Sequence, residues 1–217
     1  MNTTTLQFKA ALAARLGEPY SDIVLLKPLK NGIRIMDKVT RKPLGGLAFD
    51  YLRNAGGVYV SCEVAGGIVH EVLAGLALPY ESNLFNGDTM FFNSLSEERK
   101  EFSPDAGGVV RVHDGMDIDR TCGEIVERLA RHHIPKMERL LAVGEGLIDD
   151  VAANPLHYAY PLPVIAICLL RNGCQDVDAA LAPYARNKRI ARNRNLDFLA
   201  ALKAHPLCAS PAGTHRP

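Results

Sequence analysis

The sequence lacks the signatures by which most enzymes and metalloproteins are recognised. Its five cysteines are an odd number, widely spaced and without a Cys-x-x-Cys pair, which argues against a zinc site, a redox motif and a disulfide framework. None of its glycine pairs lies in a Gly-x-Gly-x-x-Gly or P-loop motif, so we interpret them as turns. We therefore expect neither a cofactor nor a bound metal.

Long apolar runs are also missing. The longest candidate, Val164–Leu170, falls far short of the roughly 20 residues that a bilayer-spanning helix needs. The N-terminus lacks the basic-then-apolar order of a secretory signal. These two absences predict a cytosolic protein with no membrane partner.

The sequence does show a change of apolar period near residue 115. Residues 5–16 favour an amphipathic helix that ends at Gly17, with an apolar stripe formed by Leu6, Ala10, Ala13 and the neighbouring Leu12 and Leu16. Apolar residues then alternate, as in β-strands, up to about residue 115, most clearly over Val58–Val64. The region from 20 to 115 is therefore predicted to be rich in strands.

Two segments complete the predicted sheet. Gly66-Gly67 favours a tight hairpin into a strand at Ile68–Leu76. Val109–His113 has the pattern of a final strand.

Helical spacing follows over 117–204. Thr121 and Glu124 match a capping box, and Asp117 and Asp119 add favourable charge at the start of this first helix. We expect the helix to end at Arg131-His132-His133, where cations interact well with a helix C-terminus. Further helices are predicted at the segments that follow: Lys136–Ala142, Gly144–Ala153, Pro163–Leu170, a helix capped by Asp176 or Asp178, and Leu196–Ala204.

Together these patterns predict an α+β protein. An N-terminal helix precedes an antiparallel sheet of about four to six strands, and a C-terminal group of about four to six helices packs on the sheet. No Gly/Ser-rich linker divides the chain, so we expect one domain over 1–204 and a flexible tail over 205–217.

A few residues could form a ligand pocket between sheet and helices. The candidates are His70, His113 and Asp114, with Cys62 as a nucleophile. The alternation places Cys62 on the apolar face of its strand, which favours a buried, inert thiol. The acidic cluster over 113–119 has the wrong spacing for an EF-hand and fits helix capping better than metal binding.

The strongest indication of a partner is a basic segment near the C-terminus. Formal net charge is only +1, yet residues 179–217 hold seven Lys and Arg against one Asp. Five of these cations fall within nine residues: Arg186, Lys188, Arg189, Arg192 and Arg194. The segment has no aromatic side chain to stack on bases, so a protein partner is favoured over nucleic acid. A solvated helix face remains the structural alternative.

One resemblance adds to this interpretation. The run from Ile125 to Arg186, with Ile134-Pro135, Leu140, Gly173 and Ala180, resembles the C-terminal half of certain bacterial α+β proteins from domain-of-unknown-function families. These families include immunity-like proteins encoded near polymorphic toxins. The resemblance implies the fold more than the function, and it carries no catalytic residue. Together with the lack of a catalytic constellation and the expected platform of sheet and helices, it favours a non-enzymatic protein that binds another macromolecule, as a toxin-neutralising immunity protein does. The alternatives are an enzyme or small-ligand binder that uses the pocket residues, and a nucleic-acid binder that uses the basic segment.

Overall fold

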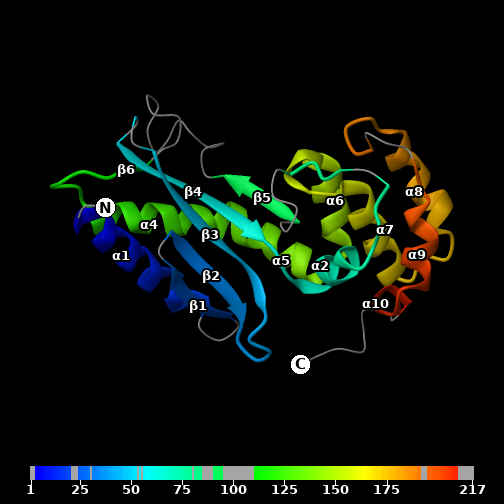
Figure 1. Ribbon diagram of the computed structural model, residues 1–217, viewed down its shortest axis with the longest axis horizontal. Coiled ribbons are helices and arrows are strands. Elements are labelled where there is room, and N and C mark those ends of the chain that lie inside the picture. The colour runs from blue at the N-terminus through cyan, green and yellow to red at the C-terminus, as the bar shows by residue number, and fades with distance from the viewer. Residues whose placement is uncertain are drawn as a thin grey trace. The chain divides into compact units, whose positions relative to one another are not determined.

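The computed structural model describes residues 3–20, 24–29, 31–52, 54, 56–79, 81–84, 90–94, 110–191 and 195–209. Contacts gather the chain into two compact units (Figure 1). Unit 1 comprises Met1–Ala65 and Phe92–Pro135, and unit 2 comprises Gly66–Phe91 and Lys136–Pro217. The boundaries therefore do not fall at the change of period near residue 115. The single domain expected over 1–204 stays a prediction.

Unit 1 is built on an antiparallel meander. Strands β1 to β4 pair in sequence order, β5 follows β4, and β6 also pairs with β4. The elements of this part of the chain are α1 (Thr3–Tyr20), β1 (Val24–Leu29), β2 (Gly32–Asp37), β3 (Pro43–Leu52), β4 (Gly57–Val64), β5 (Phe91–Ser94), β6 (Val110–Arg111) and α4 (Ile118–Arg128). An N-terminal helix, an antiparallel sheet and later helices confirm the predicted α+β class.

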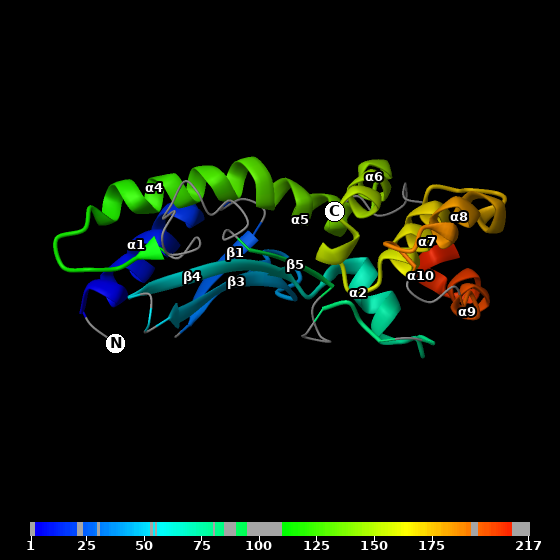
Figure 2. The same cartoon turned by 90° about the horizontal axis from the view of Figure 1, so that it is seen from above.

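One face of this sheet packs against helices. The strand register places Leu47 opposite Ile33 and Cys62, and all three side chains are buried. Helices α1 and α4 lie together on this side of the sheet (Figure 2). The Cys122 thiol of α4 contacts the carbonyl oxygen of Phe8 in α1 at 3.7 Å. The apolar residues that alternate along β4 therefore belong to the core of unit 1.

The apolar stripe of α1 differs from the predicted one. Leu12 and Leu16 are buried as expected, but Leu6 is 55% exposed. Phe8 and Thr5 are buried instead, which sets the stripe at spacings of three and four residues. The helix also continues past Gly17 to Tyr20.

Unit 2 is helical and is organised around α7. Eight consecutive residues of α7, from Pro161 to Cys168, are buried, so this helix has no solvent face over two turns. The helices of this part of the chain are α2 (Gly67–Ala74), α5 (Ile134–Ala142), α6 (Glu145–Ala153), the 3₁₀ turn η5 (Pro155–His157), α7 (Pro161–Arg171), α8 (Val177–Arg186), α9 (Phe198–Ala204) and α10 (Pro206–Ala209). Helices α2, α6, α8, α9 and α10 all contact α7.

The predicted strand at Ile68–Leu76 is wrong, because this segment forms α2. Its buried residues are Val69, Val72 and Leu73, at the three- and four-residue spacing of a helix rather than the alternation of a strand. Gly67 adopts a φ of +80°, a conformation that glycine reaches without strain. The glycine pair thus turns the chain from β4 into a helix instead of closing a hairpin.

The start and end of the first helix after the sheet also need correction. Asp117 is its N-cap and accepts a hydrogen bond from the Arg120 backbone N–H at 3.0 Å, so the predicted capping box at Thr121 is not formed. The Thr121 hydroxyl instead donates to the Asp117 carbonyl oxygen inside the helix. The helix does not end at Arg131-His132-His133, because a π-helical turn, η4 (Leu129–His133), continues into α5. Such a turn can absorb Pro135, which lacks a backbone N–H.

The remaining helix predictions are confirmed with one addition. Gly173, with a φ of +75°, ends α7, and Asp176 caps α8 by accepting from the Ala179 backbone N–H at 3.0 Å. The chain does not fray at residue 205, because α10 is held by a hydrogen bond from the Arg171 guanidinium to the Leu207 carbonyl oxygen at 2.5 Å. Residues 210–217 of the predicted tail lie outside the described residues.

Candidate functional sites

Two of the predicted pocket residues, His113 and Asp114, lie in the loop between β6 and α4 of unit 1. His113 borders a cavity of about 370 Å³. Its Nδ1 lies 3.1 Å from the Asp114 carbonyl oxygen, and the Asp114 carboxylate accepts from the Thr4 hydroxyl at 2.6 Å. The cavity is lined by Val110, Arg111, His113, Gly115, Met116, Asp117, Arg120, Thr121 and Glu124.

Three of the charged side chains that line this cavity already have partners. Arg120 forms an ion pair with Glu124 at 2.9 Å, and Asp117 is committed to capping α4. Asp119, the other carboxylate of the acidic cluster, pairs with Arg15 at 3.1 Å. Over the described ranges, no three His, Cys, Asp or Glu side chains are arranged to hold a metal ion. The cluster therefore has a structural role at the joint between sheet and helix.

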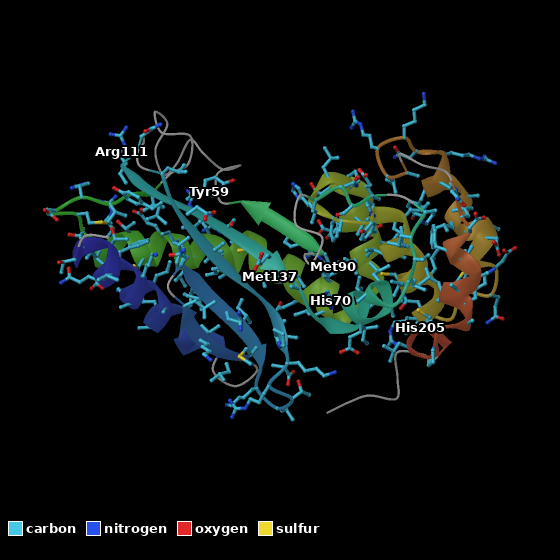
Figure 3. All side chains as sticks on the ribbon, viewed as in Figure 1. Tyr59, His70, Met90, Arg111, Met137 and His205 are labelled. Atoms are coloured by element: carbon cyan, nitrogen blue, oxygen red, sulfur yellow. The ribbon has the colours of Figure 1, made fainter. Side chains whose placement is uncertain are left out.

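His70, the third pocket candidate, lies on a different element. It belongs to α2 in unit 2, whereas His113 and Asp114 belong to unit 1. Figure 3 labels His70 on α2 and Arg111 on β6. His113 and Asp114 are neighbours in the chain, and the residue from a distant segment that contacts them by a hydrogen bond is Thr4 of α1.

The thiols do not form a nucleophilic site. Cys62 is fully buried, and burial raises its pKa far above the ordinary range. Burial also raises the pKa of Cys122 to about 11, although the nearby Arg15 charge lowers it. Because the thiolate is the reactive form, both cysteines are inert at neutral pH. The predicted burial of Cys62 is confirmed.

The basic segment begins at the end of α8 and is partly described. Arg186, Lys188 and Arg189 are exposed, and Arg192 and Arg194 lie outside the described residues. Ile190 and Ala191 are 4% and 5% exposed, so they anchor the loop to the body of unit 2. We call residues 186–191 the basic loop.

Hydrogen bonds at Asn187 give the basic loop a defined shape. The Asn187 side-chain oxygen accepts from the Arg189 backbone N–H at 3.0 Å, and its carbonyl oxygen accepts from the backbone N–H groups of Ile190 and Ala191. Within the part of the chain that the structure describes, none of the three loop cations forms an ion pair. The loop thus presents positive charge on a fixed backbone.

A polar network around Asp150 in unit 2 was missed by sequence reasoning. Asp150 accepts from the Tyr158 hydroxyl at 2.6 Å and from the Asn154 side-chain amide at 3.0 Å, and Arg139 lies 3.8 Å from it. Burial, followed by the hydrogen bond to Asp150, raises the pKa of Tyr158, so the hydroxyl stays protonated as a donor. Arg139 lies on α5 and Asp150 on α6, while Asn154 and Tyr158 flank η5, and no local motif marks these residues. The network ties these elements together.

Comparison with known proteins gives no information about these candidate sites. The chain matches no family model, no curated protein and no solved structure. Among the described residues, no helix is long and apolar enough to cross a membrane.

Proposed function

We propose that this is a non-enzymatic protein that binds an acidic surface of another protein through the basic loop. The supporting observation is the exposure of Arg186, Lys188 and Arg189 on a backbone anchored by Ile190 and Ala191. Uncompensated charge attracts a partner of opposite charge, and a fixed backbone lowers the entropy lost on binding. The loop therefore has both the charge and the order that recognition requires.

The other functions have less support. An enzyme with Cys62 or Cys122 as its nucleophile would need an accessible thiolate, and both thiols are buried with raised pKa values. A site that binds single-stranded nucleic acid stacks bases on aromatic rings, and the segment from Arg186 to Arg194 has none.

The resemblance to immunity-like bacterial proteins suggests a more specific form of this proposal. In this form the protein is bacterial and cytoplasmic, and its partner is a toxin encoded beside it. An immunity protein works by covering a toxin surface with complementary shape and charge, so it needs no catalytic motif. The acidic surface recognised by the basic loop would then belong to the toxin.

Two charge-reversal variants test the proposal. The loop variant changes Arg186, Lys188 and Arg189 to Glu. The turn variant changes Lys38, Arg41 and Lys42 to Glu and serves as a control, because it alters the net charge equally at another exposed site. The purified product of an adjacent gene is titrated against each variant by calorimetry, and growth is followed on co-expression.

We expect the loop variant to bind the adjacent product at least about tenfold more weakly than the unmodified protein, and the turn variant to bind within about threefold of it. Growth protection should fail with the loop variant alone. Equal weakening by both variants, or no binding and no protection by the unmodified protein, would contradict the proposal. Tight, steeply salt-dependent binding of duplex DNA would favour the nucleic-acid alternative.

A further inference from the structure

The sheet of unit 1 has a second face, opposite the one that packs against α1 and α4 (Figure 2). Side chains alternate between the two faces along each strand, so the register assigns residues to this second face. Leu25 and Leu29 of β1 and Leu52 of β3 lie on it and are 38%, 41% and 42% exposed. Three large apolar side chains of this face are thus accessible to solvent, on β1 and β3, whereas Ser61 of β4 on the same face is buried.

One row of residues crosses this face and carries opposite charges at its two ends. Lys27 pairs with Arg34, Arg34 with Gly46, and Gly46 with Glu63, so the row runs through β1, β2, β3 and β4. Lys27 and Arg34 lie in the half of the row on β1 and β2, and the carboxylate of Glu63 lies in the half on β3 and β4. Among the described strand residues, the other charged side chains of this face are Asp50 and Arg111, which lie in other rows.

The two cations of this row are an unfavourable pair within one chain. Lys27 and Arg34 lie directly opposite each other on neighbouring strands, both are exposed, and like charges in such a pair destabilise a sheet. A carboxylate placed over them would relieve this repulsion. On this face Glu63 lies at the far end of the same row.

We propose that this face binds a second copy of the chain, in a two-fold symmetric dimer. Rotation about an axis parallel to the strands, between β2 and β3, places β1 of one copy over β4 of the other. Lys27 of each copy then lies over Glu63 of its partner, and Arg34 lies over Gly46, which adds no side chain in its way. The row is therefore complementary to itself, as a two-fold interface requires.

The size of the face predicts a weak dimer. Four strands at a spacing of about 4.8 Å, with about seven residues at about 3.4 Å each, cover roughly 450 Å² per copy. Stable interfaces bury about 800 Å² per partner, so we expect a dissociation constant of tens of micromolar, to order of magnitude. The charge pairs make the association sensitive to salt. The dimer does not depend on the basic loop, which belongs to unit 2.

Charge exchange on the full-length protein tests the dimer. Sedimentation velocity is measured from about 5 to 500 µM protein, at about 50 and 500 mM salt. Lys27→Glu should weaken dimerisation at least about tenfold, and Glu63→Lys should do the same, because each leaves two like-charge contacts across the interface. The double variant Lys27→Glu/Glu63→Lys should restore most of the affinity.

Weaker dimerisation of the Lys27→Glu variant would not result from a less stable monomer. The Lys27→Glu carboxylate lies opposite Arg34 in the same chain, so we expect the monomer to be at least as stable, as thermal melting would show. Lys188→Glu in the basic loop is the matched control and should leave dimerisation unchanged. A protein that stays monomeric at about 500 µM in low salt, well above the expected dissociation constant, would overturn the proposal. A dimer insensitive to Lys27→Glu, or not restored by the double variant, would overturn it as well.

Discussion

The two units use their positive side chains differently. In unit 1, Lys27 and Arg34 share a sheet row with the carboxylate of Glu63. In unit 2, the cations of the basic loop are exposed and have no acidic partner among the described residues. A surface that carries both signs in one row can complement a copy of itself, whereas a surface of one sign needs a different, acidic partner. The same residue types thus suit the two units for different partners.

Their cores differ as well. Unit 1 buries one face of its strands against helices, and the opposite face keeps exposed residues on β1, β2 and β3 but not on β4. Unit 2 surrounds α7, whose residues from Pro161 to Cys168 are all buried. Substitutions in α7 should therefore have larger effects on stability than substitutions on the surfaces of either unit.

The largest effect is expected at the centre of α7. Ile165 is fully buried, so Ile165→Ala should lower the free energy of unfolding by about 3 kcal/mol, through lost apolar contacts and a residual cavity. Chemical denaturation measures the change. Leu156→Ala is the control, because Leu156 is 60% exposed and should cost less than about 0.5 kcal/mol. Equal costs would show that α7 is not the core of unit 2.

A smaller effect is expected in the Asp150 network. Tyr158→Phe removes the hydroxyl that donates to Asp150 at 2.6 Å and should destabilise the protein by about 1.5 kcal/mol, since hydrogen bonds to charged groups are stronger than neutral ones. The same denaturation experiment measures it. Tyr51→Phe removes a hydroxyl from an exposed side chain of unit 1 and should be close to neutral. A neutral Tyr158→Phe would mean that the network adds nothing to stability.

The helix caps should contribute equally in the two units. Asp117 and Asp176 each accept a hydrogen bond of 3.0 Å from the backbone N–H three residues later. Replacing either with Ala should cost about 1 kcal/mol, and replacing it with Asn should cost much less, because Asn also caps helices. The two losses should add, as is usual for distant sites. If Asn proved as costly as Ala, the carboxylate charge rather than the cap would be responsible.

The last prediction concerns the solvent accessibility of the cysteine thiols rather than the stability of the protein. Four of the five cysteines are buried and Cys174 is partly exposed. Burial raises the pKa of Cys168 to about 12, so this thiol is both buried and almost entirely protonated at neutral pH. Iodoacetamide should therefore modify Cys174 first, and Cys174→Ser should remove the fast phase seen by mass spectrometry. Early modification of Cys62 would contradict the burial that excludes it as a nucleophile.

Much of the fold could be predicted from local patterns. The alternation over Val58–Val64 and the turn at Asn172-Gly173 each have one physical interpretation, and both are confirmed. The segment after Gly66-Gly67 was misassigned because a short apolar run fits a strand and a buried helix equally well. Asp117 was correctly placed at the helix start, but the cap itself was assigned to Thr121 and Glu124, which offer a more familiar capping pattern four residues later.

The candidate sites were harder to predict from the sequence than the fold. The basic segment is visible because its cations are contiguous, but its anchoring by Ile190 and Ala191 depends on tertiary packing. The row that joins Lys27 to Glu63 depends on the register of four strands, which no single segment specifies. Contacts made between distant segments therefore had to come from the structure.

We propose above that the exposed cations of the basic loop form a specific site for acidic protein surfaces. Its most direct test is a titration of a fluorescently labelled poly-L-glutamate peptide with the unmodified protein, the loop variant and the turn variant in low salt. We expect the loop variant to bind the peptide at least about tenfold more weakly, and the turn variant, with the same net charge, to stay within about threefold of the unmodified protein. Equal loss of affinity in both variants would show that net charge alone attracts the peptide and that the basic loop is not a specific site.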